Sequence, residues 1–239
     1  MFRGIFSFAA AAFALVSTVS MPANAKVPGQ TICYNGICHT VLTLAETKAA
    51  VGAFREETAS YYDVPGRDRF NPRLETSSGQ TFDAEADDTV ASPVYPDGTE
   101  LLLWNPENER SAHVRVNNAG PYHTNRTLDC SRELAERLDF IHRGTARLLA
   151  IVIAAPNFEQ ARYKKGRVYD PVEGYVGTID PADIAAISRN LRYAIAAGPA
   201  PDRLSPDLAQ LAPGPSQLPD QPEPEVVAAL DRWVIEPVR

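Results

Sequence analysis

Short apolar runs separated by turn residues fill the middle of the chain, between about residues 53 and 155. Residues 100–104 and 112–116 flank a polar segment that contains proline and asparagine, and this pattern predicts a β-hairpin. Residues 148–153 form a continuous apolar run, which is typical of a strand buried on both faces. Many short strands of this kind favour a small β-barrel.

Two segments repeat apolar residues with helical spacing instead. In residues 131–142 they recur at i, i+4 and i+7, which predicts one short amphipathic helix. A longer pattern begins with Asp180 as a helix N-cap and Pro181 in the first turn, and it ends at Gly198. We expect this second helix to pack on the barrel or on a partner.

The first 25 residues have the pattern of a cleaved secretory signal. Arg3 supplies a positive charge, residues 8–16 are all apolar, and residues 23–25 read Ala-Asn-Ala, an A-x-A cleavage site. The alternative is a membrane anchor, but nine apolar residues fall far short of the ~20 that span a bilayer. Because no lipid-accepting cysteine follows the site, we expect an exported, periplasmic protein without a lipid anchor or a membrane span.

Composition excludes several classes of protein. Among 239 residues, 44% are hydrophobic and 22% are charged, close to the averages of globular proteins, which excludes a wholly disordered chain or a polytopic membrane protein. The net charge of -7 supplies no field that attracts phosphate backbones, so we expect no nucleic-acid partner.

The predicted export favours a disulfide between two of the three cysteines, because thiols tend to pair in oxidising compartments. Cys33 and Cys38 flank an Asn-Gly pair, the strongest signal for a two-residue hairpin turn, and this geometry predicts a disulfide between them. A metal site that combines them with His39 lacks a second cluster of ligands. Cys130 is then expected to be a free, buried thiol.

The C-terminal segment, residues 199–239, holds nine of the 20 prolines and is predicted to be a disordered, proline-rich spacer. Near its end Val226, Leu230 and Trp233 recur at helical spacing. This short amphipathic segment is either an element that docks on an envelope protein or a terminal turn that folds back on the domain.

Four motifs in the middle of the chain resemble, in order, those of the rare lipoprotein A (RlpA) family. They are Ala-Ser-Tyr-Tyr at 59–62, Thr-Ser-Ser-Gly-Gln-Thr-Phe-Asp at 76–83, Val-Arg-Val-Asn-Asn-Ala-Gly-Pro-Tyr at 114–122 and Leu-Asp-Cys-Ser at 128–131. The resemblance implies a mainly β fold, a six-stranded double-psi β-barrel with a short helix. It also implies lytic transglycosylase activity on peptidoglycan glycan strands, without cofactor or metal.

Three polar positions depart from the family's motifs. The family has Ser-Gly-Glu, Ala-Ala-His and Asn-Asp-Arg-Gly-Pro where this chain has Gln80, Ser92 and Asn118. A lytic transglycosylase needs a carboxyl that protonates the leaving oxygen and then accepts the proton of the C6 hydroxyl, and an amide does neither. Asp129 and Arg115 remain, and Asp129 is either a relocated acid or a cap for the helix that follows it.

Further candidates are weighed against plain structural roles. Asp87 and Asp88 lie in a polar loop, where adjacent acids are usually solvated. Of two histidines near the motifs, His113 alternates with apolar strand residues, while His123 follows the Gly-Pro turn and is the better candidate to face a cleft. Aromatic rings suit sugar faces, although about half of those present belong to the core; they are Tyr61, Tyr62, Tyr95, Trp104 and Tyr122.

We therefore expect a signal peptide at 1–25, a disulfide hairpin and connector at 26–52, the barrel at 53–155, a loop and amphipathic helix at 156–198, and the tail at 199–239. The favoured hypothesis is an exported envelope protein that binds peptidoglycan with weak or absent cleavage. One alternative is an active lytic transglycosylase that uses Asp129 or a loop aspartate, and another is a protein-protein adaptor.

Overall fold

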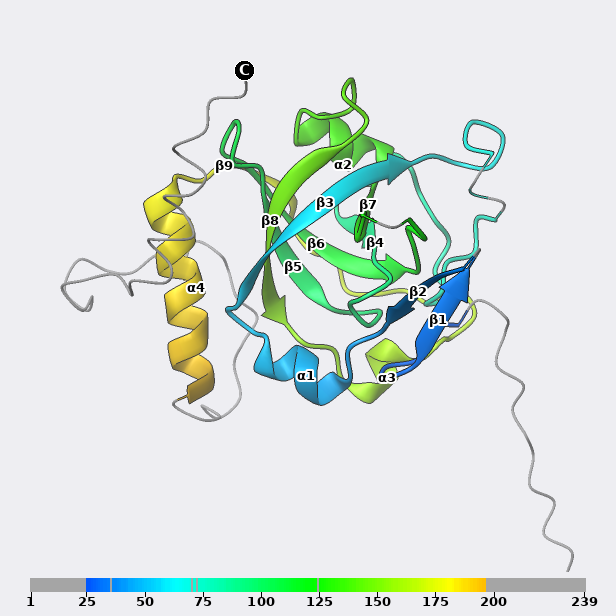
Figure 1. The fold of residues 1–239 in the computed structure, drawn as a ribbon, viewed down its shortest axis with the longest axis horizontal. Coiled ribbons are helices and arrows are strands. Elements are labelled where there is room, and N and C mark those ends of the chain that lie inside the picture. The colour runs from blue at the N-terminus through cyan, green and yellow to red at the C-terminus, as the bar shows by residue number, and fades with distance from the viewer. Residues whose placement is uncertain (1–24, 35, 70, 72, 124, 197–239) are drawn as a thin grey trace, which may run out of the picture.

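The computed structural model describes residues 25–34, 36–69, 71, 73–123 and 125–196. Its main sheet has the strand order β4-β7-β3-β8-β5-β6-β9, and β4 pairs with β6 as well. This last pairing closes six strands into a barrel, with β9 added along β6 (Figure 1). The barrel strands are β3 (Phe54–Tyr62), β4 (Thr89–Ala91), β5 (Glu100–Trp104), β6 (Arg110–Asn118), β7 (Leu128–Ser131) and β8 (Ala146–Ala154). The structure confirms the expected mainly β fold.

Strand pairing follows the apolar pattern of the sequence. β5 and β6 form the predicted antiparallel hairpin, with Leu101 opposite Val114. The apolar run at 148–153 lies inside β8, which pairs with β3 on one side and β5 on the other. Two pairs, β3 with β7 and β4 with β6, are parallel, so the chain must cross the barrel between them. These crossings bring the end of β6 beside the end of β4.

The core fills the barrel and extends under the last helix. Leu102, Val114 and Ile151 are completely buried, as expected for strands covered on both faces. α4 (Pro181–Ala196) lies along one side of the barrel and contributes Ile184 and Leu191 to the same apolar cluster (Figure 1). The helix predicted over 131–142 is shorter, because α2 (Arg132–Arg137) ends before Asp139 adopts a positive φ of 63°.

The N-terminal part of the structure is a hairpin of β1 (Thr31–Tyr34) and β2 (Ile37–Thr40), followed by α1 (Leu44–Ala49). Cys33 and Cys38 are bonded with their Cα atoms 4.0 Å apart, which confirms the predicted disulfide; Cys130 is the buried free thiol. The remaining elements are α3 (Phe158–Ala161) and β9 (Gly174–Thr178).

Two predicted segments lie outside the described residues: the signal sequence up to residue 24 and the proline-rich tail, together with the predicted helix end at Gly198. Within the part of the chain that is described, no helix has the length and apolar character needed to cross a membrane.

Candidate functional site

The ends of β4 and β6 bring together the three positions at which the sequence departs from the family's motifs. The Ser92 amide donates to the Asn118 carbonyl oxygen at 3.0 Å, because β4 and β6 run parallel to this point. The segment 76–80 closes over the same strand end, where the Asn117 side-chain amide donates to Gln80 Oε1 at 3.2 Å. Gln80, Ser92 and Asn118 are therefore parts of one site.

The side chain of Asn118 is held by hydrogen bonds on both of its ends. Its Oδ1 accepts from the backbone amides of Ser77 at 3.0 Å and of Ala119 at 2.9 Å. Its Nδ2 donates to the Tyr62 hydroxyl at 3.4 Å. Ser92 is completely buried, and its hydroxyl donates to the Thr127 carbonyl oxygen at 3.0 Å. Both groups have structural partners, and neither can supply a proton to a leaving oxygen.

A buried lysine, which the sequence analysis missed, fills the space between these residues. Lys26 Nζ donates to the carbonyl oxygens of Ser92 at 2.9 Å and Asn118 at 3.0 Å, and it forms an ion pair with Asp97 Oδ1 at 2.9 Å. The Ser77 hydroxyl also donates to the Asp97 carboxylate, at 2.8 and 3.0 Å. The Lys26 and Asp97 side chains are wholly buried. The sequence analysis placed residue 26 only at the start of the hairpin and connector.

The burial of this pair opposes both charges. Burial lowers the pKa of Lys26 and raises the pKa of Asp97, while the attraction between the two groups acts in the opposite direction on each. Arg167 also favours the charged form of Asp97. We describe the pair as an ammonium and a carboxylate, because Lys26 Nζ has three acceptors around it and Asp97 has donors on both oxygens.

Asp129 lies on the other side of Asn118 in the same sheet. Ala91 of β4 is opposite Asp129 of β7 and also opposite Asn118 of β6, so only one small residue separates the two positions. Two strand spacings amount to about 9.6 Å. The Ser60 hydroxyl donates to Asp129 Oδ1 at 2.7 Å, and burial raises the pKa of Asp129 to about 6.

The alternative role of Asp129 as a helix cap is wrong. The N-cap of α2 is Ser131, whose hydroxyl oxygen accepts from the Leu134 amide at 3.2 Å. Asp129 is inside β7, and its side chain accepts a hydrogen bond from Ser60 on the neighbouring strand β3. A carboxyl that shares a face with Asn118 and has a pKa near neutral can both give and take a proton.

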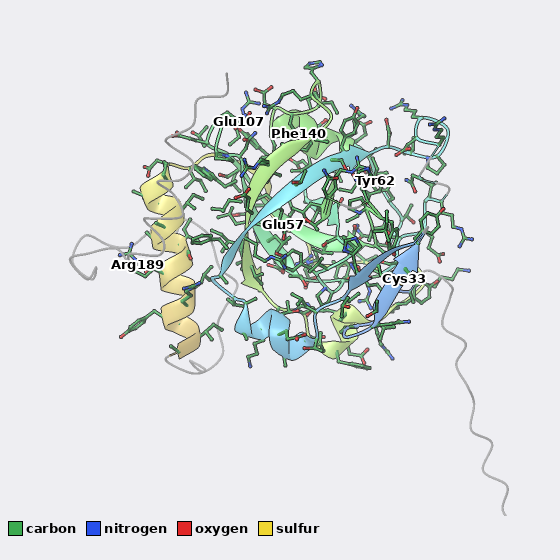
Figure 2. The ribbon with its side chains drawn as sticks, viewed as in Figure 1. Cys33, Glu57, Tyr62, Glu107, Phe140 and Arg189 are labelled. Atoms are coloured by element: carbon green, nitrogen blue, oxygen red, sulfur yellow. A yellow bond between two sulfur atoms is a disulfide. The ribbon has the colours of Figure 1, made fainter. Side chains whose placement is uncertain are left out.

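The aromatic candidates separate into buried and accessible rings. Tyr95 and Trp104 belong to the core, where the Tyr95 hydroxyl donates to Glu57 and the Trp104 indole donates to the Ile179 carbonyl oxygen. Tyr62, at the end of β3 (Figure 2), is also buried; it stacks on Phe82 with ring centroids 4.2 Å apart.

Two candidates near the Gly-Pro turn are more accessible. Tyr122 is half-buried and lies 5.5 Å, centroid to centroid, from the exposed ring of Tyr34 on the disulfide hairpin. His123 is exposed, with Nδ1 2.7 Å from Asn125 Oδ1. Tyr61 is only partly buried, packed against the core. Tyr34 and Tyr122 therefore form an aromatic surface that joins the hairpin to the barrel.

Arg115 and His113, two further candidates, lie in a different part of the barrel. Arg115 pairs with Glu100 at 2.5 Å and lies over the Tyr169 ring at 5.2 Å. The imidazole of His113 is buried with Nε2 3.1 Å from the same glutamate. These contacts hold the segment before β9 against β5 and β6.

The loop aspartates differ from each other. Asp87 accepts from the Tyr175 amide at 3.1 Å and thereby fixes the start of β9. Asp88 is half-buried, and burial raises its pKa. Among the residues that the structure describes, no three His, Cys, Asp or Glu side chains are grouped as metal ligands.

Comparison with known proteins agrees with this architecture. Residues 56–150 match the model of a family described as lytic transglycolase. A protein of Treponema pallidum named probable endolytic peptidoglycan transglycosylase RlpA is 38% identical over 116 residues, which are 48% of this chain and 34% of that protein. A Neisseria meningitidis protein named endolytic peptidoglycan transglycosylase RlpA is 40% identical over 78 residues, 33% of this chain and 32% of that protein.

The match spans about a third of the length of these relatives. Among solved structures, the Streptomyces papain inhibitor aligns with a TM-score of 0.35 and 19% identity, over 44% of this chain and 97% of that one, which is too distant to carry an argument.

The closed six-stranded barrel and the matched residues define a double-psi β-barrel. Within that class residues 56–150 are similar to RlpA proteins, as the motifs had indicated.

Proposed function

We propose that this protein binds peptidoglycan glycan strands in the bacterial cell envelope through its barrel, and that it cleaves them slowly or not at all. The names of the RlpA relatives support peptidoglycan as the ligand. The single observation that supports weak or absent cleavage is the presence of Asn118 at the position where the family has its acid. The side-chain amide of Asn118 is hydrogen-bonded to the Ser77 and Ala119 backbone amides and to the Tyr62 hydroxyl.

The chemistry explains why this observation matters. Cleavage requires a group that protonates the departing oxygen, and general acid-base catalysis contributes roughly 10²- to 10⁴-fold to rate. Asn118 keeps the shape and hydrogen-bonding capacity of an aspartate, but it cannot give up or accept a proton as a carboxyl group does. Next to it, Lys26 and Asp97 satisfy each other rather than a substrate. A protein with this site retains sugar-binding groups and lacks the family's acid.

The binding half of the proposal is tested by co-sedimentation of the purified protein with insoluble peptidoglycan. We expect the wild type to sediment with it, and Tyr122→Ala to sediment less, because an aromatic face that can stack on sugar rings is lost. Tyr193→Ala removes a ring that is 78% exposed on α4 and serves as the matched control. Equal loss in both variants, or no sedimentation of the wild type, contradicts the proposal.

One observation favours a second candidate, an active lytic transglycosylase. The pKa of Asp129 is raised by burial to about 6, and this carboxyl lies two strands from Asn118. A carboxyl with such a pKa suits proton transfer near neutral pH. If this candidate is correct, the wild type releases anhydro-muropeptides and Asp129→Asn abolishes the release, while Asp183→Asn, an exposed acid on α4, has no effect.

The location of the protein and its division into parts extend the same proposal. Residues 1–25 act as a cleaved signal, the mature protein is periplasmic and not lipid-anchored, and residues 199–239 act as a spacer toward an envelope partner. Intact mass of periplasmic protein tests the first statement, since the mature chain is expected to begin at Lys26 with one disulfide. A mass that retains the signal, or an added lipid, contradicts it.

A further inference from the structure

The cage around Lys26 Nζ is formed only by acceptors. Two of them are the backbone oxygens of Ser92 and Asn118, and the third is the Asp97 carboxylate, all within 3.0 Å. Such a cage takes a group with several N–H or O–H donors, because an acceptor in that place would face three lone pairs. A lysine ammonium meets this requirement, and so do the hydroxyl and amino groups of a sugar.

The cage is also part of the site assigned above. Ser92 and Asn118 occupy two of the family's polar positions, and Asp97 is joined to Asn118 through Ser77, which bonds to both. Besides burial, the negative charge of Asp97 contributes to raising the pKa of Tyr62 and of the half-buried Tyr122. A glycan strand that lies on the family's site would therefore meet these acceptors.

We propose that this cage is a sugar-binding subsite beside Asn118 and that Lys26 occupies it in the resting protein, as an intramolecular competitor that the glycan strand displaces. The inference rests on the proposed function, because it names how the same site is regulated. Sugar hydroxyl groups then donate to Asp97 and to the two carbonyl oxygens in place of the ammonium.

The occupant can leave while the cage remains. Lys26 precedes the β1–β2 hairpin, and the contacts that anchor this segment begin after it, where Gly29 and Gln30 bond to Val41. Displacement leaves Asp97 without the Lys26 ammonium, so the donors of the glycan must offset the attraction that is lost. The Asp97 carboxylate keeps Ser77 as a donor and Arg167 as a nearby positive charge after Lys26 has left.

Lysine labelling tests the proposal on the unmodified protein. The chain has four lysines, of which Lys48, Lys164 and Lys165 are exposed while Lys26 is buried. We expect reductive methylation to modify Lys26 Nζ, which fragment mass spectrometry distinguishes from the α-amine of the same residue, roughly tenfold or more slowly than Lys48 Nζ, because modification requires local opening. Soluble peptidoglycan glycan strands are expected to raise the Lys26 rate several-fold and to leave the Lys48 rate unchanged.

The direction of this change is diagnostic. A ligand that binds the folded state suppresses global unfolding, so it slows the labelling of every buried group that it does not displace. Glycan binding with unchanged or slower labelling of Lys26 overturns the inference and leaves the proposed function intact. Absence of glycan binding in the same samples overturns the proposed function itself.

A variant provides a second measurement. Lys26→Ala empties the cage, and Lys48→Ala on α1 is the matched control. If Lys26 occupies the cage in about nine molecules of ten, its removal tightens glycan binding about tenfold. Unchanged affinity in a folded Lys26→Ala protein contradicts the proposal; should this variant not fold, the labelling of the wild type decides alone.

Discussion

Two carboxyl groups flank Asn118, and they differ both in their burial and in their partners. Asp97 is wholly buried with the Lys26 ammonium and the Ser77 hydroxyl. Asp129 is partly buried, its Oδ1 accepts from the Ser60 hydroxyl, and its pKa is raised to about 6. Burial raises the pKa of both carboxyl groups, but a buried ammonium opposes this rise at Asp97, whereas a neutral hydroxyl is the main group that opposes it at Asp129.

The comparison predicts different responses to mutation, of which the largest concerns the charged pair. Lys26→Met keeps the cage covered and dry but leaves Asp97 without its cation, which is expected to lower the free energy of unfolding by about 3–5 kcal/mol at pH 7. Urea unfolding measures the effect. Lys48→Met on the exposed face of α1 is the control and is expected to change stability by less than about 0.5 kcal/mol.

The same prediction has an internal check. In the double variant Lys26→Met/Asp97→Asn the uncompensated charge is removed, so part of the lost stability is expected to return. A double variant that is no more stable than Lys26→Met would show that packing, and not the ion pair, determines the effect.

The next largest effect is the pH dependence of stability due to Asp129. A folded pKa of about 6 lies above the ordinary aspartate value of 3.8, so the folded state binds more protons between these two pH values. Stability from this group is fully present below pH 4 and is lost as pH rises through 6, amounting to roughly 3 kcal/mol.

This contribution is isolated by comparing the wild type with Asp129→Asn, whose amide oxygen can still accept from Ser60. The difference in unfolding free energy between the two proteins is expected to grow in favour of the variant from pH 4 to pH 7. Parallel pH profiles would mean that Asp129 is ionised throughout this range in the folded protein.

The smallest predicted effect separates Asp129 from the helix that follows it. Ser131 caps α2, so Ser131→Ala is expected to cost about 1 kcal/mol of stability, while Asp129→Asn leaves the cap intact. Urea unfolding at about pH 2.5, where Asp129 is protonated in both the folded and the unfolded state, gives the clean comparison. A larger loss in Asp129→Asn than in Ser131→Ala at that pH would restore the capping role.

The strands of the barrel could be predicted from the sequence, because the residues that indicate each element are neighbours in the chain. The β5–β6 hairpin, the apolar run in β8 and the Cys33–Cys38 turn are each contained in a few neighbouring residues. The length of α2 was overestimated because apolar spacing continues past the positive φ at Asp139. No neighbouring residue indicates that conformation.

The site was only half predictable. Motif order identified Gln80, Ser92 and Asn118 as one site, which the structure brings together. Lys26 contacts Ser92 and Asn118, which are 66 and 92 residues away in the sequence, and the role of Asp97 in the site depends on its ion pair with Lys26. A long-range ion pair leaves no pattern in a single sequence, so neither residue could be assigned before the fold was known.

The central claim is that the site formed by Gln80, Ser92 and Asn118 binds sugar without the acid that cleaves it. Mass spectrometry of the products released from insoluble peptidoglycan tests this claim most directly, with wild type and Asn118→Asp assayed side by side. The account predicts no anhydro-muropeptides from the wild type and partial activity from Asn118→Asp, which rises further when Ser92→His and Gln80→Glu are added. Robust release of anhydro-muropeptides by the wild type, unchanged in Asn118→Asp, would contradict it.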